Sequence, residues 1–205
     1  LPLAFKVRRE AKVLFDAREY YPRQYEESLR FRWLEIPLRR HLCSRYLPQC
    51  DRGITVSPGL ADAYAENFGV HMQVVRSTPA YRDFAPRSAE NDAVRMVHHG
   101  VANPNRGIGN MIEIVRRLDE RFTLDLYLMG RASYIAKLKA QARGCDRIRF
   151  PEPVAFEEIV PMLNRYDVGF YYLEPIGFNV TYNLPNKLFE FIQARLAVAI
   201  GPSPN

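Results

Sequence analysis

The stretch from Val94 to Gly100, VRMVHHG, is a short apolar run that ends in turn residues. An amphipathic segment follows it, and the same alternation of apolar runs and amphipathic segments continues to the end of the sequence. This alternation is typical of a parallel sheet whose strands are joined by crossover helices. The stretch therefore predicts one strand of such a sheet.

Four further apolar runs in this half of the chain also end in turn residues. They comprise residues 124–129, 148–150, 168–173 and 197–200. Between them, apolar residues recur at helical spacing from Ile108 to Leu118 and from Phe156 to Leu163, which predicts two crossover helices. We therefore expect a five-stranded α/β unit.

The N-terminal part of the sequence has a similar but less regular pattern. It predicts strands over residues 12–15, 54–56 and 73–76. Ser57 as an N-cap and Pro58 in the first turn predict a helix after the second of these strands. Pro37 is expected to break or restart a helix within the arginine-rich segment that begins at Pro22.

The segment from Thr78 to Asn91 has prolines and charges but no periodicity, so it is predicted to link two units. The expected domains are residues 1–86, with the linker, and residues 87–205. The first has only three predicted strands, and the second stops after a strand that should feed another helix. The fold class is therefore α/β with two Rossmann-like parallel-sheet units, both incomplete.

The composition excludes several classes of protein. The chain has 205 residues, of which 47% are apolar and 25% charged, as in globular proteins and unlike disordered, collagenous or disulfide-scaffold ones. No stretch approaches the roughly 18 uncharged apolar residues that a membrane span needs. Three cysteines without partners at zinc-ligand spacing predict a reducing, cytoplasmic compartment and no metal site.

The net charge of +6 favours an anionic partner, such as a phosphate-bearing ligand or an anionic membrane surface. The basic residues are spread along the chain and crowd only between Arg23 and Arg45. No zinc-finger spacing or aromatic-interleaved basic ribbon accompanies them. We therefore expect no nucleic-acid partner.

Two predicted strand ends carry residues suited to an anion. The first is the polar loop from His98 to Gly107, in which Arg106 directly precedes a predicted helix. Backbone N–H groups at the start of a helix, together with such a guanidinium, can bind a phosphate. The alternative is an ordinary turn with a solvated arginine. The second end runs from Gly177 to Glu190, with Lys187 in the first turn of a helix, where a cation opposes the helix dipole unless an anion lies beside it. Lys187 and Glu190 are three positions apart, so a plain ion pair is the alternative there.

Four segments together resemble a known family. They are FDARE at 15–19, DRGITVS at 51–57, His99-Gly100 with Arg106-Gly107-Ile108, and PNKLFEF at 185–191. In order and spacing they resemble the retaining glycosyltransferases of family 4, the large GT-B-fold group that includes glycogen and sucrose synthases. The Pro-Asn-Lys-x-Phe-Glu segment is the most specific of the four.

The resemblance implies that the C-terminal domain binds a nucleotide-sugar and the N-terminal domain the acceptor. Arg106 and Lys187 would be the catalytic residues, holding the donor diphosphate and neutralising the leaving nucleotide, and Glu190 would bind the ribose hydroxyls. The remaining donor-binding positions would be Gly100, Gly107, Gly177, Phe178 and Asn179. Asp16, Glu19 and His99 would lie on the acceptor side. No cofactor or metal is expected, and the donor would be linked to UDP or GDP.

The resemblance also implies a retaining sugar transfer in cell-surface or exopolysaccharide assembly. The acceptor would be a saccharide or a lipid-linked molecule. The protein would be cytoplasmic, and residues 23–45 would make a peripheral contact with the anionic inner face of the membrane. The alternative for that segment is a solvated helix face that packs its aromatic residues inward, with Trp33 beside Leu29. Tyr182 stands where relatives often carry a carboxylate, which keeps a non-catalytic nucleotide-sugar-binding or scaffold protein open. A nucleotide-sugar epimerase is a further alternative.

Overall fold

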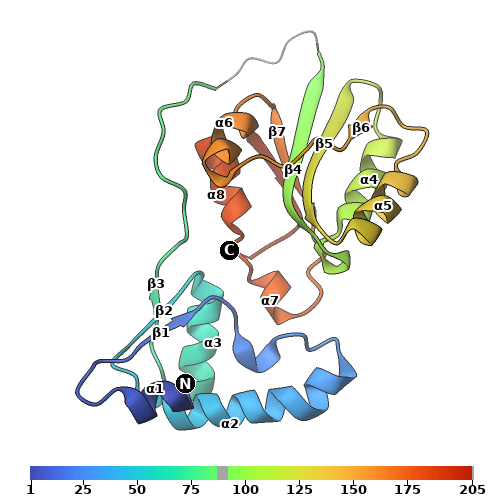
Figure 1. The fold of residues 1–205 in the computed structure, drawn as a ribbon. Coiled ribbons are helices and arrows are strands. Elements are labelled where there is room, and N and C mark those ends of the chain that lie inside the picture. Colours follow the sequence, from blue (N-terminus) through green and yellow to red (C-terminus); the bar gives the residue numbers. More distant parts are fainter. Residues whose placement is uncertain (87–91, 205) are drawn as a thin grey trace. The chain divides into compact units, whose positions relative to one another are not determined.

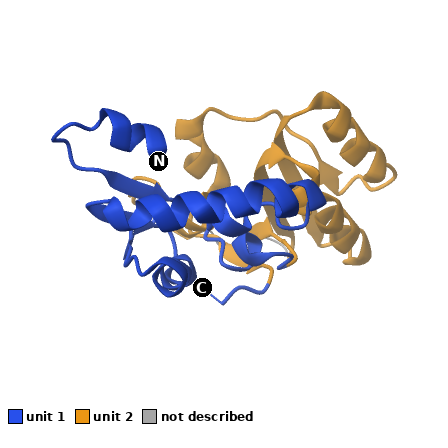
Figure 2. Ribbon diagram, turned by 90° about the horizontal axis from the view of Figure 1, so that it is seen from below, with its two compact units in different colours: residues 1–77, 175–184, 202–205 blue, residues 78–174, 185–201 orange. Residues whose placement is uncertain are grey.

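The computed structural model describes residues 1–86 and 92–204, so part of the predicted linker, residues 87–91, lies outside the described residues. The chain forms two compact units (Figures 1 and 2). Unit 1 contains residues 1–77, 175–184 and 202–205, and unit 2 contains residues 78–174 and 185–201. Each of the two units has its own parallel sheet and its own buried core.

Unit 2 is built on a five-stranded sheet whose strands are all parallel. Its strands are β4 (Val94–Ala102), β5 (Phe122–Gly130), β6 (Ile148–Arg149), β7 (Val168–Tyr171) and β8 (Ala197–Ile200). They lie in the order β6-β5-β4-β7-β8. In chain order within the unit this is 3-2-1-4-5, the order of the first five strands of the classic Rossmann fold. The predicted class, with two Rossmann-like parallel-sheet units, is confirmed.

Helices cover both faces of this sheet (Figure 1). One face carries α4 (Ile108–Arg117) and α5 (Ala132–Gln141), and the other carries α6 (Ile159–Leu163) and α8 (Asn186–Gln193). The apolar stripe of α4 is fully buried at Ile108, Met111, Ile112 and Val115, as its helical spacing predicts. Burial of these stripes against the sheet supplies the hydrophobic free energy that holds the helices in place.

Unit 1 has a three-stranded parallel sheet in the order β1-β2-β3. Its main elements are α1 (Pro2–Val7), β1 (Leu14–Ala17), α2 (Ile36–Tyr46), β2 (Arg52–Thr55), α3 (Pro58–Phe68), β3 (Gln73–Val74) and α7 (Phe178–Thr181). Short 3₁₀ turns cover Tyr21–Arg23 and Leu47–Gln49 in this unit, and Pro104–Arg106 and Phe156–Glu158 in unit 2. The unit 1 core is centred on Tyr64, whose ring meets Phe15, Tyr20 and Phe68.

The arginine-rich segment is helical over residues 29–46 and changes from a π-helical turn to an α-helix just before Pro37, so the expected break does not occur. A π-helical turn over Phe31–Glu35 precedes α2, and Pro37 lies in the first turn of α2. Proline has no N–H to donate, so it is tolerated where the first N–H groups of a helix lack partners anyway. The wider turn lets the N–H of Ile36 bond the carbonyl of Phe31 before α2 begins.

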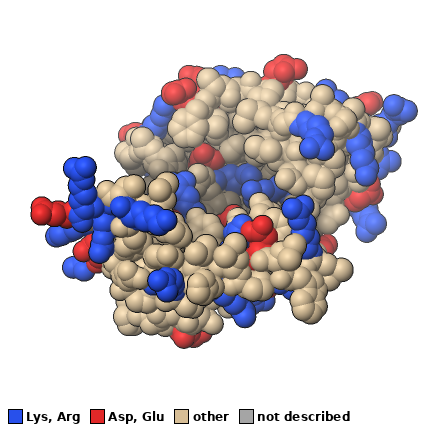
Figure 3. Space-filling view, turned by 60° about the horizontal axis from the view of Figure 1, so that its bottom comes forward, with Lys and Arg blue, Asp and Glu red and all other residues tan. Residues whose placement is uncertain are grey.

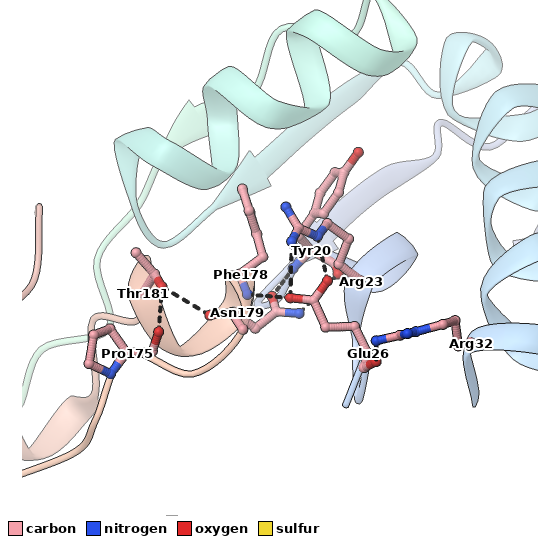
Figure 4. A network of polar contacts seen from close by, with 9 residues as sticks. Tyr20, Arg23, Glu26, Arg32, Pro175, Phe178, Asn179 and Thr181 are labelled. Carbon is pink, nitrogen blue, oxygen red and sulfur yellow. Dashed lines mark hydrogen bonds and ion pairs between the residues drawn. The ribbon is translucent and has the colours of Figure 1, made fainter. Parts of the chain in front are cut away.

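Residues 175–184 pack within unit 1, although they follow a strand of unit 2 in sequence. The side chain of Asn179 accepts a bond from the backbone N–H of Tyr20 (2.6 Å) and donates to the carbonyl of Tyr20 (3.1 Å). The carboxylate of Glu26 accepts the N–H of Phe178 at 2.6 Å (Figure 4). The hydroxyl of Ser57 donates to the carbonyl of Tyr182. These side-chain bonds, together with the backbone bonds of the short helix α7, give partners to the polar backbone groups of this segment that they involve.

Two searches of the described residues are negative. No helix among residues 1–86 and 92–204 is long and apolar enough to cross a membrane. Within the same ranges, no three His, Cys, Asp or Glu side chains are grouped so as to hold a metal ion.

A buried polar network links β5, β6 and the start of β7 in unit 2. Arg149 donates to both carboxylate oxygens of Asp125, its cross-strand neighbour, at 2.7 and 3.1 Å. The hydroxyl of Tyr166 donates to Asp125 at 2.7 Å and lies 2.8 Å from that of Tyr127. Asp125 is buried, so its charge is acceptable only because these donors surround it.

We predict that Asp125→Ala lowers the free energy of unfolding of unit 2 by about 3 kcal/mol, because it leaves a buried hydroxyl without its acceptor and removes a charge pair. Native-state hydrogen exchange of the β5 amides measures this loss. Asp119→Ala is the matched control, since Asp119 also holds an arginine, Arg121, by two contacts but on an exposed surface. Equal loss of protection in the two variants would contradict the prediction.

Candidate functional site

The candidate site lies in unit 2, where the carboxyl ends of β4 and β7 meet. These two strands are neighbours in the sheet, although β5 and β6 lie between them in the sequence. The strand order reverses at this point, and ligands of doubly wound sheets bind beyond such strand ends. Gly100 comes near the end of β4 and Tyr171 is the last residue of β7.

Lys187 reaches this point from the first turn of α8. Its Nζ lies 4.6 Å from the ring centroid of Tyr171, a cation–π contact. A side chain at Gly100 would meet it, since a Cβ built there lies 3.4 Å from the same Nζ. Gly100 has φ +123°, a backbone conformation that side chains rarely adopt. The backbone conformation is what requires glycine here, and the lysine end packs directly against it.

Arg106 approaches the same tyrosine from the loop after β4. Its Nη1 lies 3.5 Å from the hydroxyl of Tyr171. Gly107 follows with φ +63°, and a Cβ there would lie 2.6 Å from the carbonyl oxygen of Tyr172. Only glycine fits this left-handed turn, which ends the loop and begins α4. The two basic residues predicted from the two strand ends are thus brought together around one ring.

The cluster concentrates positive charge. Burial and the neighbouring guanidinium of Arg106 lower the pKa of Lys187 to about 8, and Glu190 opposes this only in part. The structure gives no ion pair between Lys187 and Glu190 or any other described carboxylate, so the plain ion pair considered above is wrong. A shift of this size disfavours the charged amine by roughly 3 kcal/mol. An anion placed between the two cations would remove that cost.

Two histidines of β4 pack next to the residues of the site. His98 is fully buried, and its Nδ1 donates to the carbonyl of Phe170 at 2.9 Å while its ring stacks on Tyr171. Burial, helped by Lys187, lowers the pKa of His98 well below its usual value, against the opposing effect of the Phe170 bond. His98 is therefore neutral and serves as packing for Tyr171.

His99 faces Glu190. Its Nε2 lies 3.1 Å from Oε2 of Glu190, but the approach is off the hydrogen-bond direction, and this buried nitrogen has no hydrogen bond to any described residue. The ring packs edge-on against Phe191. Glu190, on α8 with Lys187, thus has its carboxylate beside the cation cluster, with acceptor capacity left.

The other predicted site residues lie in unit 1. Gly177, Phe178 and Asn179 belong to the segment that packs on Tyr20 and Glu26, so the structure does not include them in the cluster of unit 2. Their donor-binding role stays a prediction.

The two acidic residues of the predicted acceptor side follow one another closely along the chain. Asp16 is exposed on β1 and pairs with Arg18 at 3.5 Å, and Glu19 accepts a bond from Gln24. Their role in acceptor binding also stays a prediction.

Comparison with solved structures identifies the fold. A TarM mutant of S. aureus in complex with fondaparinux, α-GlcNAc-glycerol and UDP is similar over 100% of this chain, with a TM-score of 0.73 and 9% identity. HepE of Anabaena in complex with UDP-glucose is similar over 98%, with a TM-score of 0.69 and 14% identity. These neighbours are GT-B glycosyltransferases. The fold is GT-B.

The likeness is one of structure alone. No protein-family model matches the sequence, and no curated protein sequence matches it either. The chain spans 40% of the length of TarM and 55% of that of HepE. It therefore corresponds to about half of such a protein or less.

Sequence reasoning missed Tyr171, the residue on which the two cations converge. It falls inside a predicted apolar strand and looks like a core residue, which its burial confirms. Its position as the last residue of the strand, at the carboxyl end of a parallel sheet, is the signal that would have found it.

We predict that UDP binding weakens about tenfold between pH 7 and pH 9.5, because the amine of Lys187 loses its proton as the pH passes about 8. Lys187→Arg should bind UDP with little change over this range, since a guanidinium stays charged. Isothermal titration calorimetry at the two pH values measures both effects. The same pH dependence in wild type and Lys187→Arg would show that another group titrates.

Proposed function

We propose that this chain is the donor-binding unit, with part of the acceptor-binding unit, of a glycosyltransferase. The enzyme transfers a sugar from a UDP- or GDP-linked donor to a saccharide or lipid-linked acceptor, with retention, in cell-surface or exopolysaccharide assembly. It acts on the cytoplasmic side of the membrane and needs no cofactor. The observation that carries the proposal is the pair of cations, Arg106 and Lys187, at the switch point of a Rossmann-like sheet.

The chemistry of such a transfer explains why two cations are needed. When the bond between the sugar C1 and the diphosphate oxygen breaks, negative charge builds up on the leaving nucleotide diphosphate. Fixed positive groups aimed at that oxygen stabilise the transition state more than the ground state. Arg106 presents a planar fork of donors to the diphosphate, and Lys187 presents a compact point charge from the helix start.

Glu190 completes the donor site in this proposal. It lies one turn after Lys187 on α8, so a nucleotide whose diphosphate meets Lys187 would bring its ribose toward that carboxylate. A carboxylate accepts bonds from two hydroxyls at once. The similar structures of TarM and HepE, solved with UDP and UDP-glucose, support a donor of this class.

The decisive experiment is a transfer assay on the full-length protein that contains this chain. Radiolabelled UDP- and GDP-sugars are supplied with and without a lipid-linked saccharide acceptor. Label in the acceptor supports the proposal. Binding without turnover supports a non-catalytic nucleotide-sugar-binding or scaffold protein, and a changed sugar on the nucleotide without acceptor supports an epimerase.

We predict that Lys187→Ala and Arg106→Ala each weaken UDP binding about tenfold or more, because each removes a charge-assisted contact. Arg116→Ala is the matched control. Arg116 lies at the far end of α4 and bonds only backbone carbonyls among the described residues. Calorimetry with UDP measures the affinities, and unchanged binding in either site variant removes that residue from the donor site.

We also propose that residues 23–45 contact an anionic membrane surface. The expectation that this segment packs Trp33 and Leu29 inward is wrong, since their exposed fractions are 74% and 68%, and Leu34 is 67% exposed. Helical periodicity shows only that such residues share a face, not what covers it. Exposed arginines such as Arg30 and Arg32 lie next to them in the sequence. Lys and Arg side chains are widespread on the molecular surface (Figure 3). Aromatic and basic side chains on one helix suit the membrane interface.

We predict that the protein pellets with phosphatidylglycerol vesicles at low salt and far less at high salt, because each basic residue contributes about 1 kcal/mol before screening. The double variant Trp33→Ser/Leu34→Ser should pellet much less. Leu3→Ser, at an equally exposed leucine of α1, is the control and should behave as wild type. Protein that stays in the supernatant at low salt, or pellets equally with neutral vesicles, contradicts this contact.

A further inference from the structure

Unit 1 has a pocket of about 840 Å³ that none of the residues of the cation cluster in unit 2 lines. Its charged lining consists of Arg23, Glu26, Glu27, Arg32 and Arg40. The apolar wall is formed by Ile36, Pro37 and Ile176, among others. The pocket therefore combines three guanidinium groups with an apolar wall.

The described residues that line the pocket include three arginines and two glutamates, and only one arginine and one glutamate among them form an ion pair with each other. Arg23 is paired with Glu26, through bonds of 2.6 and 3.2 Å, and rests over the ring of Phe178. The same carboxylate accepts the N–H of Phe178, so Glu26 has little capacity left for a further cation (Figure 4). Burial raises the pKa of Glu26, but the bonds from Arg23 and Phe178 outweigh it and hold the pKa below its usual value. Glu26 is thus ionised and already occupied.

The two remaining arginines are not matched by carboxylates. Arg32 donates only to the backbone carbonyl of Glu26, at 3.1 Å. Arg40 makes no hydrogen bond or ion pair with a residue that the structure describes. Glu27, the other acidic residue of the pocket, also has no such partner within the described chain. Two guanidinium groups and one carboxylate therefore line the pocket without an ion-pair partner among the described residues.

We propose that this pocket binds a phosphate, sulfate or carboxylate group attached to a saccharide, so that the acceptor of the transfer is an anionic sugar. Planar guanidinium groups bind such oxyanions by parallel N–H bonds. The apolar wall suits the CH faces of a sugar ring beside the anion. That the bound sugar is the acceptor rests on the proposed function, whereas the oxyanion site itself does not.

The test uses glucose 6-phosphate, with glucose as the uncharged comparison, titrated into the chain saturated with UDP. UDP occupies the donor site, so a second binding event reports another site. NMR chemical-shift titration gives the affinity. We expect saturable binding of glucose 6-phosphate and far weaker binding of glucose.

Variants connect that binding to the pocket. Arg32→Gln and Arg40→Gln should each weaken glucose 6-phosphate binding about tenfold, because each loses a charge-assisted contact. Arg30→Gln removes an exposed arginine of the same segment that does not line the pocket, and should bind as wild type. Glu27→Gln should tighten binding severalfold by removing a like charge, a gain that misfolding cannot produce.

Several results would overturn the proposal. No saturable binding in the UDP-saturated protein, or an equal loss in Arg30→Gln, shows that the pocket is not an oxyanion site. Wild-type UDP binding with no glucose 6-phosphate binding leaves the proposed function standing and removes only this inference.

Competition by phosphatidylglycerol vesicles that depends on Arg40 supports the oxyanion site and assigns the anion to a lipid headgroup.

Discussion

A lysine amine that is largely surrounded by protein loses the hydration that stabilises its charge, and a guanidinium beside it raises the cost further. Lys187 is held in this position between Gly100 and the ring of Tyr171, with Arg106 on the same tyrosine. Only the cation–π contact and a more distant carboxylate offset the cost. The described residues therefore offset the positive charge of the cluster only in part, which is the property expected of an anion-binding site.

The sheet of unit 2 explains how residues 81 positions apart form one cluster. β4 and β7 are neighbours because the chain winds first to one side, through β5 and β6, and then returns to the other. Their carboxyl ends meet, so the loop with Arg106 and the start of α8 with Lys187 face a common space. Gly107 permits the tight turn into α4, and the buried stripe of α4 fixes that helix on the sheet. The core thus determines the distance between the two cations.

Much of unit 2 was predictable because its signals are local. Each apolar run ends in a turn, and each helix has its own stripe, so strand and helix positions, Arg106 and Lys187 followed from the sequence. What could not be predicted depends on partners distant in the chain. Tyr171 resembles a core residue in the sequence, and only the fold shows that Lys187 and Arg106 both approach its ring. Trp33 was expected inside because periodicity does not show which face of a helix is covered. The bonds between the amide of Asn179 and the backbone of Tyr20, 159 positions away, are likewise indicated by no local pattern, while the donor-binding role of Asn179 stays a prediction.

The cations of the unit 2 cluster and those of the unit 1 pocket differ in chemical type, and this difference bears on the roles proposed for them. In unit 2 one of the charges is an amine whose pKa lies near 8, so its binding strength depends on pH and on whether a neighbour supplies negative charge. In the pocket of unit 1 all the cations are guanidinium groups, which stay charged at any pH the fold tolerates. If the unit 2 cluster binds the donor diphosphate as proposed, a cation that is costly to keep charged when the site is empty favours both binding and release of that anion. If the unit 1 pocket binds an anionic sugar as proposed, its arginines supply a charge that does not vary with pH.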